Sequence, residues 1–151
     1  MNLITRIEQD YVAAYKTGDR LRLSVLRLLK TAAKNTLVEL KRPGGELSEA
    51  EWRSVLVKQA KQRQDSIEQF HAASRHDLAD REKAELCILR EYLPAPLNPE
   101  ELDAAINAAI AKTGASSLKD MGRVMQKLTT EYAGRADGKI LSSLVRAKLA
   151  S

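Results

Sequence analysis

The side chains that could carry chemistry in this sequence are mainly cationic and are concentrated near its end. From Lys119 onward there are seven Lys and Arg but only three Asp and Glu. Gly122 interrupts a helical run there at a cost of ~1 kcal/mol relative to Ala, which is typical of a close approach by a ligand or another backbone. Arg135 lies in a glycine-flanked loop just before a helix start, whose free amides favour phosphate. The pattern predicts a phosphate site, and a plain turn capped by Asp137 is the open alternative.

A second basic group lies earlier in the chain. Seven basic residues and one acidic residue fall between Arg20 and Arg42. Four of them recur every seven residues and therefore share one face of a helix, with Lys30 between two of them; the four are Arg20, Arg27, Lys34 and Lys41. A helix face of this kind is commonly only solvated, and the alternatives are a nucleic acid or an acidic protein partner.

Other chemistry has little support in the sequence. His71 and His76 do not match zinc-ligand spacing, and the single cysteine, Cys87, is expected to be a buried small apolar side chain. There is no phosphate-binding glycine loop, nucleophile elbow or evident catalytic triad. We therefore expect no metal, no cofactor and no catalytic centre within this chain, and whether it serves an enzyme stays open.

Composition predicts an all-α protein. The sequence is 44% hydrophobic with only 4% aromatic residues, and Leu and Ala are abundant, which favours helices. The net charge of +5 permits a polyanionic partner. The N-terminal residues lack the apolar region of a signal peptide, and no apolar run approaches the ~20 residues needed to cross a bilayer. The expectation is a cytoplasmic protein without membrane contact.

The spacing of apolar residues predicts seven helices. Four fall at about residues 2–16, 20–41, 49–73 and 78–92, a fifth at 99–112, a sixth after Ser117, and a seventh that includes Ile140 and Leu149. Ser48 and Glu51 form a capping box, and Asp77 is expected to cap the fourth helix. Pro94 and Pro96 make a stiff connector. They predict an N-terminal multi-helix domain over residues 1–93 and a smaller three-helix C-terminal domain over residues 97–151.

Several motifs resemble those of one known family. The segments at residues 120–125 and 134–139, together with 22–27, 61–67 and 92–94, are similar to YqeY proteins, and the resemblance covers nearly the whole chain. These small proteins share a domain with the tail of GatB, a subunit of the tRNA-dependent amidotransferase. Where that tail has Asn-Pro, this sequence has Asp137 and Gly138.

The resemblance implies a helical protein that binds tRNA or another structured RNA, with a link to carbon–nitrogen ligase activity that uses glutamine as amide donor. Amidotransferase subunits or a tRNA synthetase would be its protein partners. The expected RNA-binding residues are Lys119, Gly122, Arg123, Lys127, Gly134, Arg135, Lys139 and Arg146, with Arg20, Arg27, Lys30, Lys34 and Lys41 as a secondary basic stripe. The alternative is an accessory subunit or protein-interaction scaffold without RNA contact.

Overall fold

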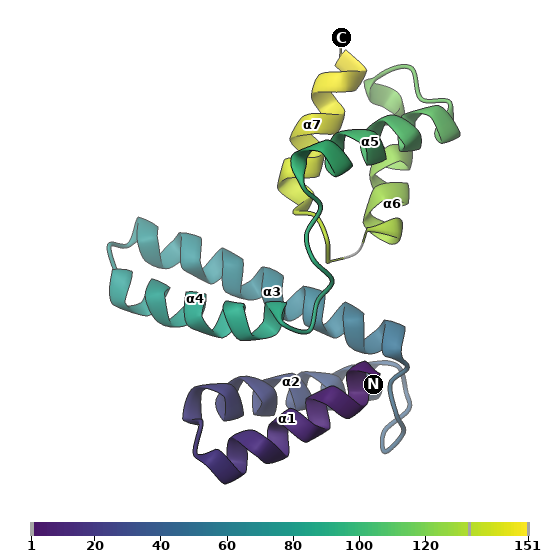
Figure 1. Cartoon of the computed structure of the whole chain (residues 1–151). Helices are drawn as coiled ribbons and strands as arrows, with labels where there is room; N and C mark the ends of the chain where they lie inside the picture. The colour runs from purple at the N-terminus through teal and green to yellow at the C-terminus, as the bar shows by residue number, and fades with distance from the viewer. Residues whose placement is uncertain (1, 133, 151) are drawn as a thin grey trace. The chain divides into compact units, whose positions relative to one another are not determined.

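The fold is all-α, as the composition predicts. A computed structural model describes residues 2–132 and 134–150, and in these ranges it contains seven α-helices, one short 3₁₀-helix and no strand (Figure 1). The internal contacts divide the chain into two units, residues 1–93 and 94–151. Each unit has its own apolar core and is described by itself.

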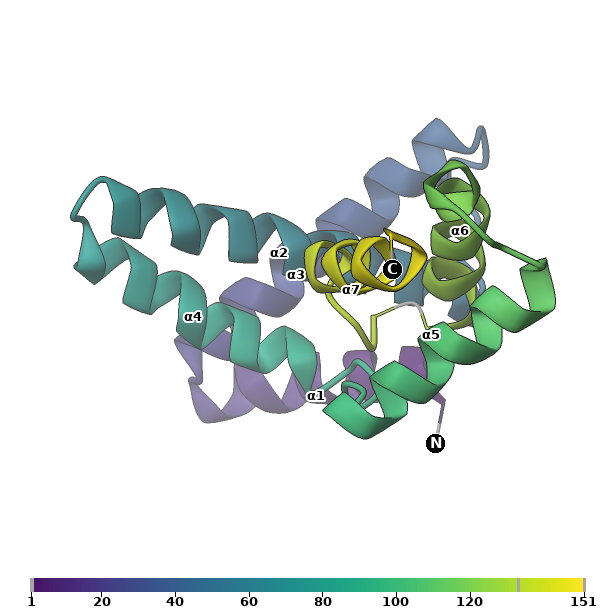
Figure 2. The ribbon, with the colours of Figure 1, turned by 90° about the horizontal axis from the view of Figure 1, so that it is seen from above.

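Two helical hairpins form the N-terminal unit. Helices α1 (Leu3–Thr17) and α2 (Arg20–Glu39) are joined at Gly18, whose positive φ of 74° suits glycine. Helices α3 (Glu49–Ala72) and α4 (His76–Arg90) run side by side in both Figures 1 and 2. The α1–α2 hairpin packs on α3 and α4, so its outer surface remains in solvent.

The core of this unit combines apolar packing with one buried ion pair. Leu26, Leu56 and Leu89 bring α2, α3 and α4 together and are almost completely buried. Arg63 of α3 pairs with Glu85 of α4, with Nε and Oε2 3.4 Å apart. Their side chains are 8% and 9% exposed, so this pair belongs to the interior and differs from the exposed ion pairs on the surface.

The C-terminal unit is a three-helix bundle. It consists of α5 (Pro99–Thr113), α6 (Met121–Glu131) and α7 (Gly138–Ala150), with the 3₁₀-helix η1 (Leu118–Asp120) directly before α6. Each helix buries one apolar stripe against the other two. Among the described residues of this unit, the largest fully buried side chains are Ile106, Val124, Leu128, Leu141 and Val145.

All seven expected helices are present, with two corrections at their starts. The capping box of Ser48 and Glu51 is confirmed. The expected cap at Asp77 is wrong, because α4 already begins at His76, and Asp77 lies in its first turn, paired with Arg75. Ser117 precedes a 3₁₀ turn instead of starting α6 directly.

The expected burial of Cys87 is also wrong, because its side chain is exposed. Its sequence neighbours Leu86, Ile88 and Leu89 are buried. Successive helix residues point about 100° apart, so a residue between buried neighbours can still face solvent. The described helices include none that is long and apolar enough to span a membrane.

Replacing Leu26 with alanine should destabilise the N-terminal unit much more than the same change at Leu28 of the same helix. Leu26 is fully buried, whereas Leu28 is 49% exposed. We expect Leu26→Ala to lower the free energy of unfolding by ~2–5 kcal/mol because it leaves a cavity. Leu28→Ala should change it by no more than ~0.5 kcal/mol. Urea unfolding followed by the fluorescence of Trp52, the chain's one tryptophan, reports on this unit; equal losses would contradict the packing described.

Candidate nucleic-acid interface

Three cations form a row along the outer face of α2. Arg20, Arg27 and Lys34 are seven residues apart, which places each about 10 Å from the next along the helix axis. Their side chains are exposed, opposite the stripe that buries Val25 and Leu29 in the core. Lys41 continues the series just after the helix, in a left-handed conformation with φ of 61°. We call Arg20, Arg27, Lys34 and Lys41 the α2 row.

The α2 row differs from the other cations of this segment in having no acidic partner. Within residues 2–132 and 134–150, none of its four members forms an ion pair. By contrast, Lys30 is 3.3 Å from Glu8 and 4.3 Å from the ring centroid of Tyr11. Lys30 therefore stands apart from the stripe to which the sequence assigned it.

Arg22 and Arg42, which flank the row, are also engaged by acids. Arg22 contacts Glu91 at 2.5 Å, and this hydrogen bond is the main reason that its pKa is raised. Arg42 pairs with Glu51. The positive charge left uncompensated on this surface is therefore that of the α2 row.

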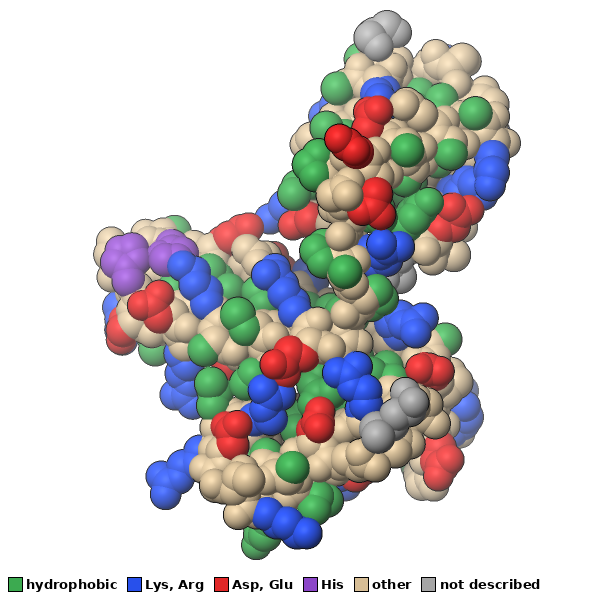
Figure 3. Space-filling view, viewed as in Figure 1, with side chains coloured by type: hydrophobic (Ala, Val, Ile, Leu, Met, Phe, Trp, Pro, Cys, Tyr) green, Lys and Arg blue, Asp and Glu red, His purple; other side chains and the backbone are tan. Residues whose placement is uncertain are grey.

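The cations of α6 are held by neighbouring carboxylates. Arg123 pairs with Asp120 at 2.6 Å, and Lys127 pairs with Glu131 at 2.8 Å. On the face of the C-terminal unit seen in Figure 3, acidic and basic side chains are interspersed. The structure thus places Arg123 and Lys127 on one helix, but with much of their charge balanced locally.

Arg135 holds the beginning of the C-terminal unit in place. Its Nε donates a hydrogen bond to the carbonyl of Ala95 at 2.9 Å, and Nη2 is 3.8 Å from Glu101. Its own carbonyl accepts a hydrogen bond from the amide of Leu97 at 2.8 Å. These contacts fasten the segment after Leu93 to the loop before α7, so Arg135 has a structural role whether or not it also meets a phosphate.

The start of α7 has an internal cap. Oδ1 of Asp137 accepts a hydrogen bond from the amide of Lys139 at 2.7 Å. This is the capped turn that the sequence left open as the alternative to a phosphate site. The carboxylate occupies one amide that a phosphate would need and adds negative charge beside it. Gly134 has a φ of 77°, as expected of glycine at a turn.

The remaining expected contact residues of this unit lie on its surface. Lys119, Lys139 and Arg146 are exposed, on η1 and α7. Gly122 is exposed as well, and a Cβ atom built on it would meet nothing within 4 Å. Its glycine is therefore not required by a neighbouring part of the protein, which leaves the approach of an external molecule as a reason for it.

The two histidines meet at the turn between α3 and α4. The Nδ1 atoms of His71 and His76 are 2.9 Å apart, although the sequence suggested no relation between them. No group of three or more metal-ligating side chains occurs in the described parts of the chain.

Comparison with known proteins identifies the family. The family model described as "Yqey-like protein" matches residues 4–149. The chain belongs to the YqeY family. Among its relatives is "Altered inheritance of mitochondria protein 41, mitochondrial" of Lachancea thermotolerans, which is 27% identical over 99% of this chain and 80% of the relative. The protein of the same name from Candida glabrata is 30% identical over 61% of this chain and 50% of its own length.

The sequence identified the cations of α2 and of the C-terminal unit as candidates, but it did not show that several of them have acidic partners. The spacings of Asp120 and Arg123, three apart, and of Lys127 and Glu131, four apart, are those of helix ion pairs and could have been recognised. The contacts of Arg135 with Ala95 and Glu101 could not have been recognised from the sequence, because they join residues far apart in the chain.

Replacing Arg123 with glutamine should raise the pKa of Asp120 only part of the way to its usual value. The amide of Ser116, 2.9 Å away, is the main cause that lowers this pKa, and Arg123 comes second. Because the folded-state pKa is lowered, the contribution of Asp120 to stability is present above its unfolded-state pKa and is lost as the pH falls through the folded-state value. An NMR titration of the carboxyl carbon measures the shift, and Arg146→Gln is the matched control; the same pKa in Arg123→Gln and wild type would refute this account.

Proposed function

We propose that this YqeY-family chain binds structured RNA, with tRNA as the first candidate. The observation that carries the proposal is the α2 row, a line of exposed cations along one helix face without acidic partners. Phosphate neutralisation by such side chains releases counterions and supplies much of the affinity for nucleic acids. Partnered cations contribute less, because an ion pair must be broken before a phosphate is bound.

The composition favours recognition of RNA shape and backbone. Aromatic residues are only 4% of the chain, so there are few platforms on which unpaired bases could stack. A helical RNA presents phosphates and 2′-hydroxyls to such a surface without requiring base contacts. The choice of tRNA comes from the resemblance to the GatB tail, and the α2 row itself selects only a polyanion.

The C-terminal unit would add a second, weaker contact. Lys119 of η1 and Arg146 of α7 are exposed, and Gly122 of α6 leaves space for a close approach. Arg123 and Lys127 would contribute after exchanging their carboxylate partners for phosphates. Under this proposal Arg135 acts mainly by holding the loop at residues 134–138 in shape.

The expected link with amidotransferases is part of the same proposal. A chain that binds tRNA would serve a carbon–nitrogen ligase by presenting the RNA to amidotransferase subunits or a tRNA synthetase in the cytoplasm. Purification of the tagged chain from cells, followed by mass spectrometry, tests for these partners. Recovery of RNA without them would restrict the function to RNA binding, and recovery of the proteins without RNA would favour the scaffold alternative.

Removing two charges from the α2 row should weaken tRNA binding and its dependence on salt. We expect Arg27→Gln/Lys34→Gln to reduce the slope of log K against log salt concentration by about 1.5, since each lost phosphate contact removes about 0.7–0.9. Fluorescence anisotropy of a labelled tRNA transcript at several salt concentrations gives both quantities.

The matched control is Lys83→Gln/Arg90→Gln, which removes the same charge from exposed positions on α4. It should change the slope by less than half as much as the α2 variant. Arg123→Gln/Lys127→Gln should fall between the two. Equal affinities and slopes for wild type and the α2 variant would overturn the proposal.

A further inference from the structure

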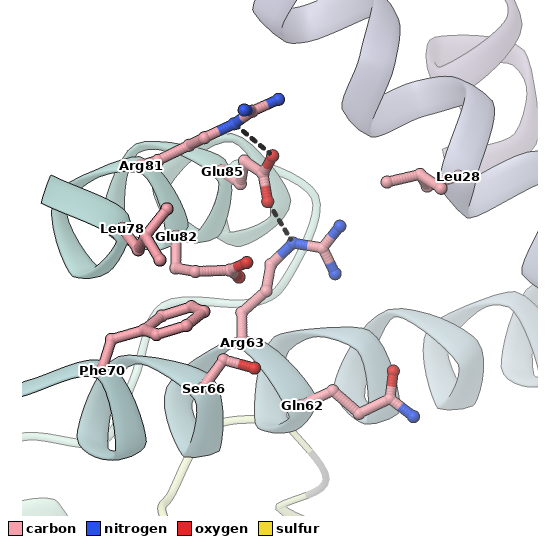
Figure 4. Close-up of a pocket in the computed structure, with 9 residues that line it drawn as sticks. All are labelled: Leu28, Gln62, Arg63, Ser66, Phe70, Leu78, Arg81, Glu82 and Glu85. Atoms are coloured by element: carbon pink, nitrogen blue, oxygen red, sulfur yellow. Dashed lines mark ion pairs between the residues drawn. The ribbon is translucent and has the colours of Figure 1, made fainter. Parts of the chain in front are cut away.

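A pocket between α2, α3 and α4 lies apart from the residues of the proposed RNA contact. Its volume is about 380 Å³, near the lower end of the ~300–1,000 Å³ usual for small-molecule sites. Figure 4 shows side chains from all three helices around it. The segment of α3 that lines it includes Arg63 and Ser66, from the motif at residues 61–67. Part of this motif therefore lines a pocket, and the proposed RNA contact does not account for that role.

The guanidinium group of Arg63 has a donor, Nη2, that meets no acceptor among the described residues. Its Nη1 donates to Gln59 Oε1 at 3.0 Å, whereas its Nε is buried without a hydrogen bond and only 3.4 Å from a Glu85 oxygen in an ion pair. Its Nη2 also has no hydrogen bond to the described protein atoms. Arg63 is 7% exposed, and its guanidinium points toward α2 (Figure 4). Because Nε is fully buried and faces Glu85, Nη2 is the donor left for an outside acceptor, and a charged N–H donor of this kind forms a strong hydrogen bond with a carboxylate.

Two carboxylates on α4 face the same pocket. Burial and the nearby charge of Glu85 raise the pKa of Glu82, although Arg63 and Arg81 partly oppose this. Two carboxylates that crowd each other in a partly desolvated place are stabilised by a cation between them. Arg81 pairs with Glu85 at 3.8 Å, but its side chain is 71% exposed at the mouth of the pocket. The pocket thus offers the Nη2 donor of Arg63 and the carboxylate of Glu82, which forms no ion pair within residues 2–132 and 134–150.

The rest of the wall is apolar. Phe70 and Leu78 line one part of the pocket, and Leu28 of α2 lies across from them (Figure 4). Leu28 is 49% exposed, although it lies on a helix whose neighbouring leucines are buried. A ligand with an aliphatic or aromatic group would cover this surface.

The balance of charge selects the type of ligand. Two arginines and two glutamates line the pocket, so a simple anion would meet two carboxylates and a simple cation would meet two guanidinium groups. A ligand that carries both charges leaves the balance unchanged. From these contacts we propose that the pocket binds a free α-amino acid with an apolar side chain, in its zwitterionic form. The carboxylate lies on Arg63 and the hydroxyl of Ser66, the ammonium group on Glu82, and the side chain against Phe70 and Leu78.

The proposal is tested by titrating the full chain with leucine and its blocked forms in a calorimeter. Leucine should bind saturably, and N-acetyl-leucine, which lacks the ammonium group, should bind at least about tenfold more weakly. Leucinamide lacks the carboxylate and glycine lacks the apolar group, and both should be weakened as well. Absence of saturable leucine binding, or equal binding of all four compounds, would overturn the proposal.

Two variants test whether Arg63 and Glu82 form the leucine site. Arg63→Lys keeps the charge opposite Glu85 but removes the Nη2 donor, and Glu82→Gln removes the partner of the ammonium group; each should weaken leucine binding about tenfold or more. If the change at buried Arg63 unfolds the chain, leucine binding by Glu82→Gln alone decides the test. Lys61→Gln, at an exposed position outside the pocket, is the control and should bind leucine as wild type does.

Unchanged binding in folded Glu82→Gln would refute the assignment. The tRNA affinity of Glu82→Gln should equal that of wild type, because the proposal does not rest on RNA binding. Failure of one proposal therefore leaves the other intact.

Discussion

The burial of Arg63 against Glu85 is the constraint on which the N-terminal unit depends. Moving two charges out of water is costly, and removing one partner of such a pair typically destabilises a protein by ~3–5 kcal/mol. Helices α3 and α4 can therefore pack only in the register that keeps these side chains together. In that register the end of α4 reaches α1, where the Tyr92 hydroxyl donates a 2.5 Å hydrogen bond to Asp10. Burial and the Asp10 carboxylate raise the pKa of Tyr92, so this hydroxyl stays protonated as a donor.

Local pairing of charges also decides which surfaces can bind a polyanion. Both units carry many cations, but the cations of α6 pair with acids three or four residues away, whereas the four members of the α2 row form no ion pair with any described residue. A row of unpaired cations creates a longer-ranged field than the same number of ion pairs, whose charges cancel within a few ångströms. The glycines and the family resemblance drew attention to the C-terminal unit, whereas the cations without acidic partners among the described residues point to α2. The positive charge that a surface offers to a polyanion therefore depends on whether its cations have acidic partners, and composition alone does not show this.

The parts of the structure that the sequence predicted are those set by neighbours within one helical turn. The apolar stripes, the capping box of Ser48 and Glu51 and the all-α class follow from such local spacing. Cys87 was placed wrongly because it was grouped with the residues beside it in sequence, which do not share its helix face. The partner of Arg63 could not be found, because Glu85 lies on another helix and no local pattern relates the two. An arginine in an apolar stripe was nevertheless a visible sign that a buried acid must exist.

The motif near the C-terminus shows how structural and binding roles can be separated. Arg135 and Asp137 each have internal contacts, to Ala95 and to the amide of Lys139, and these contacts give both residues a structural role without any ligand. Gly122 is different, because it lies in the first turn of α6 and no part of the described chain needs the space that it leaves. A residue that leaves open space and has no internal use is better evidence for an external contact than a charged residue that already has partners. For this reason a search for the RNA contact in the C-terminal unit should begin at Gly122 and not at Arg135.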